Sequence, residues 1–215
     1  MKIAVIGAGN VGGTLGRRWS ESGHEVIFGV RDLSAPKTRD LLGQCAPDTR
    51  AVAPAAAVAD ADVVVLAVWW DAVEDVVASL GDLAGKIVID CTNPLDADLK
   101  LTLGHTDSGG EAIARLAPGA RVVKAFNTIT WEAMADPEFG GRRATLFFCG
   151  GDETATEIVS GLIRDLGLDP VHVGGLEMSR CLEPLALLWI TEFRIRRPGS
   201  DYAFALIERQ GGDAK

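Results

Sequence analysis

The chain has 215 residues, of which 47% are hydrophobic and 24% are charged, and these proportions exclude disordered and collagen-like proteins. The formal net charge is −9 and no run of Lys or Arg exceeds two residues, so we expect no nucleic acid partner. The longest apolar run, Val63–Trp70, is too short to cross a bilayer, and the N-terminus lacks the apolar core of a signal peptide. We therefore expect no membrane contact and a cytoplasmic location.

Strand-like and helix-like segments alternate through the first two-thirds of the chain. The predicted strands are Lys2–Ile6, Glu25–Val30, Val63–Val68, Lys86–Cys91 and Arg121–Phe126. The predicted helices between them are Asn10–Ser22, Asp71–Leu80 and Gly109–Leu116, the last preceded by a capping box of Ser108 and Glu111. Strands separated by helices pair in parallel, so the pattern predicts an α/β fold: a Rossmann-type doubly wound parallel sheet with a small C-terminal helical extension.

The pattern after Phe126 is less regular. We expect a strand at Ala144–Cys149, a helix that starts at Asp152 or Thr154 and ends near Leu166, and a short strand at Pro170–Val173. A further helix is predicted over Arg180–Ile195, with Pro184 in its first turn. This helix is apolar nearly all round, so it is buried either within its own subunit or in a homodimer interface.

Two portions of the chain are distinguished on this basis. Residues 1–125 are predicted to form a dinucleotide-binding domain. Residues 126–215 are predicted to complete the sheet and to contribute the substrate site and a dimer helix.

The segment Gly7-Ala8-Gly9-Asn10-Val11-Gly12 fits the pattern G-x-G-x-x-G between the first strand and the first helix. In that context Gly7 permits a tight turn, Gly9 lets the backbone approach a pyrophosphate, and Gly12 lets helix and strand pack closely. The free N–H groups of the helix N-terminus then face the anion. We predict that Gly7, Gly9, Asn10, Val11 and Gly12 bind a dinucleotide.

The end of the second predicted strand indicates which dinucleotide is bound. A carboxylate there would favour NAD, and simple counting from Gly12 reaches Asp32. However, the last inward position is Val30 and Arg31 follows it, whereas Asp32 is better suited to capping the next turn. A guanidinium can hold a 2′-phosphate bidentately, and Lys37 adds positive charge nearby. The sequence therefore favours NADP(H).

Ligands of such sheets bind beyond the carboxyl ends of the strands. Aromatic and amide side chains at these ends could shelter a nicotinamide ring and bind its carboxamide, and the backbone around them would complete the pocket. The residues predicted for this role are Val68, Trp69, Trp70, Asn93, Pro94, Leu95, Ala125 and Asn127. The alternative for each tryptophan is a place in the core, and for each asparagine a turn cap.

Proton-transfer machinery is sparse in the sequence. His105, in the long loop Asp96–Asp107, and Asn127 are the candidate catalytic residues, whereas His24 and His172 are expected to be structural. The four cysteines are widely spaced and have no CxxC pair, so we predict buried thiols and no metal site. Hydride transfer between two ring cofactors needs no general acid, so this pattern fits such a reaction better than reduction of a carbonyl.

Several segments together resemble the coenzyme F420-dependent NADP oxidoreductase family. They are the glycine turn, Gly23–Val26, Asp90–Leu95, Lys124–Thr128 and Gly174–Arg180, continuing into Leu182–Leu185. The Lys-Ala-Phe-Asn-Thr run is also similar to the cytosolic reductase domain of the six-transmembrane metalloreductases. The resemblance implies hydride transfer between NADPH and a deazaflavin (F420) or a flavin, often by a homodimer.

Three positions depart from that family and leave the hydride acceptor open. Val30 replaces the usual serine or threonine, the turn is Gly-Ala-Gly rather than Gly-Gly-Thr-Gly, and Asn127 stands where some members have histidine. The other hypotheses are reduction of a small imine or ketone with His105 as proton donor, and an NADP-sensing protein without turnover.

Overall fold

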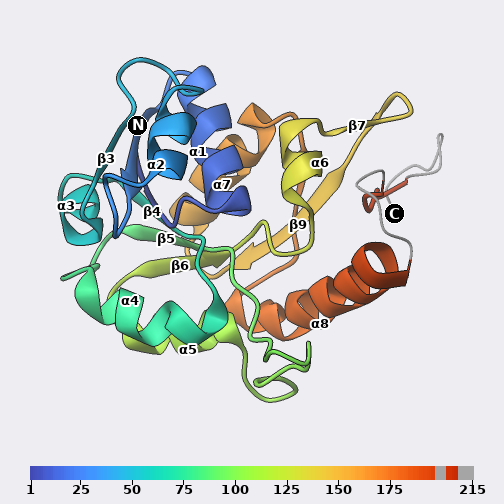
Figure 1. Ribbon diagram of the computed structural model, residues 1–215. Helices are drawn as coiled ribbons and strands as arrows, with labels where there is room; N and C mark the ends of the chain where they lie inside the picture. The colour runs from blue at the N-terminus through green and yellow to red at the C-terminus, as the bar shows by residue number, and fades with distance from the viewer. Residues whose placement is uncertain (197–201, 208–215) are drawn as a thin grey trace.

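A continuous sheet forms the centre of the computed structural model, which describes residues 1–196 and 202–207 (Figure 1). Within these residues eight strands pair in the order β10-β9-β6-β5-β4-β1-β2-β3. Their bounds are β1 Lys2–Ile6, β2 Glu25–Gly29, β3 Arg50–Val52, β4 Val63–Leu66, β5 Ile87–Asp90, β6 Arg121–Lys124, β9 Thr145–Gly150 and β10 Asp169–His172. Every neighbouring pair is parallel except β6 and β9, so the predicted doubly wound parallel sheet is confirmed in its central part.

Helices cover both faces of the sheet (Figure 1). One face carries α1 (Asn10–Glu21), α2 (Pro36–Leu42), α6 (Trp131–Ala135) and α7 (Glu153–Asp165). The other carries α3 (Pro54–Ala59), α4 (Val73–Ser79) and α5 (Gly109–Leu116), with the 3-10 turn η1 (Trp70–Ala72) leading into α4. The 3-10 turn η2 (Leu176–Met178) leads into α8 (Ser179–Trp189), which continues as the π-helix η3 (Ile190–Arg196). A small ribbon of β7 (Glu138–Phe139) and β8 (Arg142–Arg143) projects from the edge.

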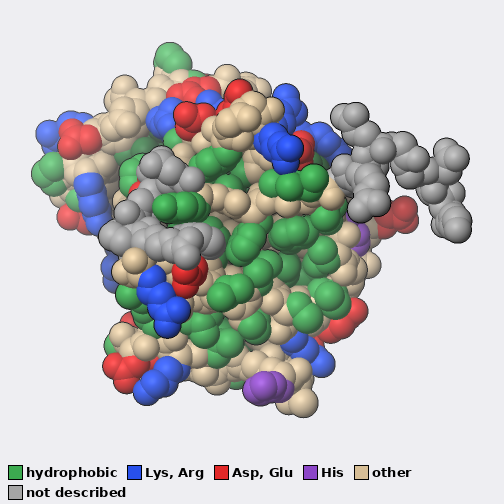
Figure 2. All heavy atoms as spheres, turned by 90° about the vertical axis from the view of Figure 1, so that its right-hand side faces the viewer, with side chains coloured by type: hydrophobic (Ala, Val, Ile, Leu, Met, Phe, Trp, Pro, Cys, Tyr) green, Lys and Arg blue, Asp and Glu red, His purple; other side chains and the backbone are tan. Residues whose placement is uncertain are grey.

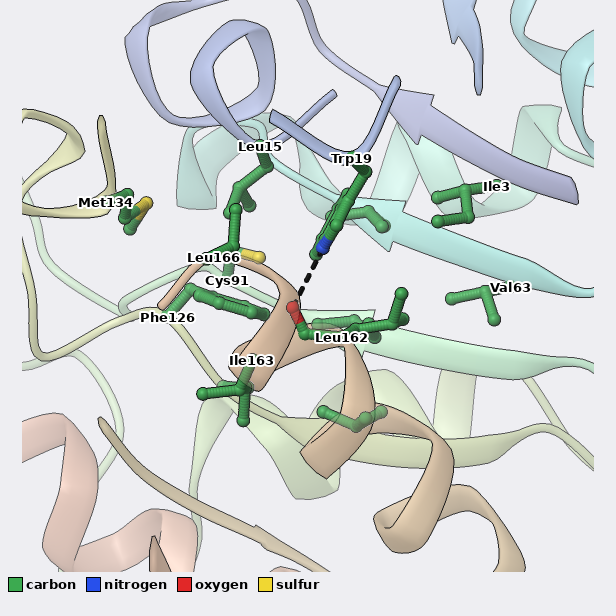
Figure 3. Close-up of a cluster of buried hydrophobic side chains, with 14 of the residues drawn as sticks. Ile3, Leu15, Trp19, Val63, Cys91, Phe126, Met134, Leu162, Ile163 and Leu166 are labelled. Carbon is green, nitrogen blue, oxygen red and sulfur yellow. Dashed lines mark hydrogen bonds between the residues drawn. The ribbon is translucent and has the colours of Figure 1, made fainter. Parts of the chain in front are cut away.

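Side chains alternate between two cores because successive strand residues point to opposite faces. In β1, Ile3 and Val5 enter the core under α1 and α7, whereas Ala4 and Ile6 enter the core under α3 and α4. The first core is centred on Trp19, whose indole N–H donates to the carbonyl of Leu162 at 3.0 Å (Figure 3). These two cores fix the strand ends on which the candidate site is built.

Most predicted elements are confirmed, with strand ends within two residues of the predictions. Three short elements between residues 31 and 62, namely α2, β3 and α3, were not predicted. The prediction for Pro184 was wrong, because α8 begins at Ser179 and Pro184 therefore lies inside the helix. Proline has no N–H to donate to the carbonyl four residues earlier, so this helix forms with one bond fewer than a regular one.

Two further observations concern the whole chain. In residues 1–196 and 202–207, every helix is too short or too polar to cross a membrane. The second predicted portion supplies β9 and β10, which extend the same sheet as β1–β6. The extended segment 202–207 lies beside the start of β9, where the Thr145 N–H donates to the Phe204 carbonyl at 2.8 Å.

Candidate functional site

The glycine turn lies between β1 and α1, and each glycine meets a different constraint. Gly7 has φ of +103°, which favours glycine, and a Cβ there would overlap the Ala67 carbonyl oxygen. A Cβ on Gly12 would overlap the carbonyl oxygen of Gly7. Gly9, in contrast, has no atom within 4 Å of a Cβ position, and no side chain caps α1 at this residue. The turn is thus closed toward the protein at Gly7 and Gly12 and open at Gly9.

The residues after β2 lie at the same edge of the sheet. Val30 is buried, whereas Arg31 and Lys37 are exposed. The Asp32 carboxylate accepts hydrogen bonds from the N–H and the hydroxyl of Ser34, at 2.9 and 2.7 Å. These hydrogen bonds lower the pKa of Asp32. The expectation that Asp32 caps a turn is therefore confirmed, and Arg31 remains available to a ligand.

Aromatic residues follow β4. Val68 is half-buried and lies 3.2 Å from a Cβ built on Gly7, so the end of β4 adjoins the glycine turn. Trp69 is 86% exposed. Trp70 is half-buried, and its ring and that of Pro94 both flank Gly109, at 3.1 and 3.3 Å from a Cβ built there. Trp70 thus belongs to the wall between β4, β5 and α5, whereas Trp69 stands free of it.

Two asparagines meet beyond β5 and β6. The Asn127 side-chain NH2 donates to Asn93 Oδ1 at 3.2 Å and to the Leu182 carbonyl at 3.1 Å. Both N–H groups of Asn127 thus have acceptors. Its Oδ1, which can only accept a hydrogen bond, has no donor among the described residues. This side chain is 7% exposed. Burial without a partner is costly, so Asn127 Oδ1 is a point where a ligand donor would fit.

The residue before Asn127 is strained. Phe126 has φ of +65°, a conformation that side chains other than glycine rarely adopt, and it is fully packed against Trp19 with ring centroids 5.7 Å apart. Non-glycine residues in this region cost about 1–3 kcal/mol each and gather at functional sites. The buried ring and the sharp turn together fix the backbone of Asn127.

Beneath the two asparagines lies a buried ion network. The Lys124 ammonium, with no exposed surface, donates to Asp90 Oδ2 at 2.7 Å, to the Thr92 carbonyl at 2.7 Å and contacts Glu183 Oε1 at 2.8 Å. Burial, the largest single effect, lowers the pKa of Lys124, but the charges of Asp90 and Glu183 together raise it above its ordinary value. The lysine therefore stays charged. The Glu183 carboxylate also accepts from the N–H groups of Gly109 and Gly110, at 3.0 and 3.1 Å.

The remaining predicted residues are less engaged. His105 is exposed and has φ of +58°, in the loop that the Leu95–Leu101 bridge closes at its start. Leu95 is half-buried and Ala125 is fully buried. His24 pairs with Asp165 at 2.9 Å, which agrees with a structural role.

The cysteines and possible metal ligands were the remaining groups predicted from the sequence. The four cysteines are free; Cys91 and Cys149 are buried as expected, whereas Cys45 is half-buried and the expectation of a buried thiol was wrong for Cys181, which is exposed. Burial raises the pKa of the Cys149 thiol to about 11, so this thiol is protonated at neutral pH. Burial likewise raises the pKa of Cys91. No group of His, Cys, Asp and Glu among the described residues could hold a metal ion.

Sequence reasoning missed the ion network. Lys124, Asp90 and Glu183 each lie in a segment that carries the family resemblance, but none of them was given a role. A signal existed for two of them, since Asp90 and Lys124 each end an apolar run and pair in register across β5 and β6. No local pattern marks Glu183, which comes from α8 far along the chain.

Comparison with known proteins gives consistent matches. Residues 2–94 match the family described as "NADP oxidoreductase coenzyme F420-dependent". The chain is 31% identical over 217 residues to the F420-dependent NADP reductase of Methanothermobacter thermautotrophicus, covering 93% of each protein. It is 31% identical over 195 residues to the metalloreductase STEAP3 of Rattus norvegicus, covering 90% of this chain but only 38% of that protein.

A solved structure extends the comparison to three dimensions. The crystal structure of a putative F420-dependent NADP reductase from Arthrobacter sp. FB24 superposes with a TM-score of 0.89 at 33% identity. The match covers 97% of this chain and 100% of that one, so the whole fold is shared rather than only the nucleotide-binding half.

Proposed function

The chain belongs to the family of coenzyme F420-dependent NADP oxidoreductases, and from that premise we propose that it transfers hydride between NADP(H) and a deazaflavin (F420) or a flavin. The observation that carries the proposal is the glycine turn, where Gly7 and Gly12 are sterically required and Gly9 alone is open. A backbone opening at a helix N-terminus is what a pyrophosphate needs. The residues present therefore fit the dinucleotide.

The two ends of the dinucleotide would be held by different chemistry. Gly9–Gly12 would bind the pyrophosphate, and the exposed guanidinium of Arg31 would bind the 2′-phosphate, with Lys37 adding charge. Val30 offers only its backbone there. In this proposal Asp32 holds the turn after β2, because its Oδ1 accepts from both the N–H and the hydroxyl of Ser34.

The nicotinamide would lie over the ends of β4, β5 and β6. Asn127 Oδ1 would accept a hydrogen bond from the carboxamide NH2, because this oxygen has no donor among the described residues. Asn93 would hold Asn127 in that orientation through their mutual hydrogen bond. The residues proposed to line the ring and its ribose are Val68, Trp69, Trp70, Pro94, Leu95 and Ala125.

The groups available at this edge support an acceptor that needs no proton from the protein. When bound, NADPH supplies a hydride, and an acceptor ring placed against it needs no proton from the protein in the same step. The Lys124 ammonium is committed to three oxygen atoms, and the buried thiol of Cys149 is protonated. His105 remains as the candidate proton donor of the competing hypothesis, reduction of an imine or ketone.

One mixing experiment tests the proposal. Purified protein and NADPH are combined in turn with coenzyme F420, FMN, FAD and a small cyclic imine, and NADPH oxidation is followed by absorbance. We expect oxidation with a deazaflavin or a flavin, and the same rate in His105→Ala. Oxidation with the imine alone, abolished in His105→Ala while NADPH still binds, would replace the proposal by imine reduction. No oxidation with any acceptor would favour a sensor.

The assembly is part of the same proposal. We propose that two copies associate through the face on which α8, β9 and the segment 202–207 lie. Figure 2 shows hydrophobic side chains gathered over this face, and the exposed apolar residues include Leu188, Ile195, Leu206 and Ile207. Faces of this kind usually mark an interaction site. A cytoplasmic location remains a prediction from the sequence.

A further inference from the structure

We propose that Lys124, Asp90 and Glu183 form a positioning device for the nicotinamide end of the dinucleotide site. The inference rests on the proposed function, and it assigns a role to buried charged groups that the proposed function leaves unused. The three side chains join the ends of β5 and β6, the start of α5 and the middle of α8. The Asn93–Asn127 pair follows the two strands and is hydrogen-bonded to α8 through the Leu182 carbonyl.

The first step concerns the Lys124 ammonium, which joins the ends of two strands to α8. Lys124 ends β6, and its Nζ contacts Asp90 at the end of β5, the Thr92 carbonyl two residues further along the chain, and Glu183 on α8. Asp90 Oδ1 in turn accepts from the Thr92 N–H at 2.8 Å and from its hydroxyl at 2.7 Å. The backbone that leads into Asn93 is therefore held from two sides.

The second step is the link to α8. Glu183 binds Lys124 with one oxygen and accepts from the N–H groups of Gly109 and Gly110 at the start of α5. The neighbouring residue of α8, Leu182, offers its carbonyl to the Asn127 NH2. A displacement of α8 that breaks these hydrogen bonds would therefore change the contacts of Glu183 and of Asn127 together.

The third step is energetic. A buried ion network is weak evidence for stability, because apolar side chains of similar volume often stabilise a core as well or better. Hydrogen-bonded charges instead fix the relative positions of the groups that they join. Here those groups are the backbone after β5, the start of α5 and α8. The strain at Phe126 and the unpartnered Asn127 Oδ1 lie on the same short segment, which is consistent with a site built for geometry.

The test compares NADPH, which carries the nicotinamide that the network would position, with a fragment that lacks the nicotinamide. Dissociation constants are measured for NADPH and for 2′-phospho-ADP-ribose, which lacks the nicotinamide, with wild-type protein and Glu183→Gln. Glu183 Oε1 contacts Lys124 and accepts from the Gly110 N–H, whereas Oε2 accepts from the Gly109 N–H. A glutamine has one acceptor oxygen, so its NH2 must face a donor at one of these positions, and the negative charge beside Lys124 is lost. We expect NADPH to bind about tenfold more weakly to the variant and the fragment to bind within about twofold of wild type.

The matched control breaks the other link between the same two helices. Arg180 on α8 pairs with Glu111 on α5, with Nε at 2.8 Å from Oε2, away from the strand ends. Arg180→Gln should leave both dissociation constants unchanged. If Glu183→Gln does not fold, Asp90→Asn is measured instead, because its amide oxygen still accepts from the Thr92 N–H.

The outcomes separate this inference from the proposed function. Equal weakening of NADPH and the fragment in Glu183→Gln, or equal weakening of NADPH in Arg180→Gln, means that the network only holds the fold and overturns the inference. Unchanged NADPH binding in Glu183→Gln overturns it as well. The proposed function fails separately, when the wild-type protein oxidises NADPH with none of the acceptors, and the binding comparison does not depend on that result.

Discussion

At the scale of single residues, Gly9 and Gly12 have opposite surroundings although both belong to one turn. Open space surrounds a Cβ at Gly9, whereas a Cβ at Gly12 overlaps the Gly7 carbonyl oxygen. We therefore propose that Gly9 is needed only for ligand binding, whereas Gly12 is needed for folding. Substitution by alanine separates the two requirements.

We expect Gly9→Ala to melt at the wild-type temperature but to bind NADPH at least about tenfold more weakly, because the new methyl group occupies the approach of the pyrophosphate. Gly12→Ala should cost about 1–3 kcal/mol through overpacking and lower the melting temperature by about 5 °C. Calorimetry and fluorescence titration of both variants measure these effects. Wild-type affinity in Gly9→Ala would remove the turn from the proposed site.

Arg31 provides a test of cofactor choice. Its guanidinium is exposed, so its loss should not affect folding. Arg31→Ala should weaken NADPH binding by about 1.5–3 kcal/mol, the value of a hydrogen bond to a charged group. NADH lacks the 2′-phosphate and serves as the internal control, with an unchanged dissociation constant. An equal loss for both cofactors would show that Arg31 does not read the phosphate.

At the scale of elements, the start of α5 is held by charged side chains on its outer side. Ser108 caps the helix by accepting from the Glu111 N–H at 3.2 Å, as the sequence predicts, and Glu111 pairs with Arg180 of α8. The hydrogen bonds from Arg180 are the main reason that the pKa of Glu111 lies below its ordinary value of 4.5. A carboxylate with a lowered pKa stabilises the fold above its unfolded-state pKa, and this contribution disappears as the pH falls through the folded-state value.

Glu111→Gln should therefore be less stable than wild type at neutral pH. We expect a loss of about 1 kcal/mol, near the lower end for such a pair because Arg180 is partly exposed to solvent. The difference should shrink toward zero between neutral pH and a pH below the lowered folded-state pKa of Glu111, where the wild-type carboxylate becomes protonated. Urea unfolding at both pH values measures it, with Glu157→Gln, an exposed position on α7, as the control. A difference that persists in acid would assign the effect to packing.

Elements differ in how far the sequence predicts them. β1, α1 and β2 follow from an apolar run, a glycine turn and a periodic helix, and the computed structure confirms them. Between residues 31 and 62 the strand β3 has three residues and α3 has six, too few for a period to be read. Pro36 and Pro54 each start a helix there, which was the available signal. Tertiary packing, rather than local pattern, stabilises such short elements.

The candidate site was predictable only where its residues lie on strand ends. Asn93 and Asn127 were expected at one edge because parallel strands end together, and they are hydrogen-bonded there. Glu183 could not be placed, because the position of α8 depends on packing between segments far apart in the sequence. The prediction for Pro184 failed for a different reason: the predicted start, Arg180, is one residue from the observed start, Ser179, and from either start Pro184 falls beyond the first turn.

At the scale of the whole molecule, the strand order decides which segments share the site. The chain leaves β1 for β2 and later returns on the other side of β1 to form β4, which creates a crevice between β1 and β4. β9 runs antiparallel to β6, so its start, rather than its end, lies at this edge. At this edge the C-terminal portion therefore contributes the helix α8 and not a further strand end. The helix is joined to the edge by Glu183, which accepts from the Gly109 N–H, and by the Leu182 carbonyl, which accepts from Asn127.

The apolar face is a second property of the whole molecule. Leu188 on α8 is 58% exposed, so a charged side chain there would not disturb the core of one subunit. If a second copy covers this face, the same charge would be buried without a partner, which is costly. Leu188→Glu should therefore be a monomer at concentrations where the wild type is a dimer, as measured by light scattering after size-exclusion chromatography. Leu116→Glu, at the end of α5, carries the same change on a different element and should remain a dimer. A wild-type protein that is monomeric at about 10⁻⁴ M would contradict the dimer, because an interface of standard size holds at that concentration.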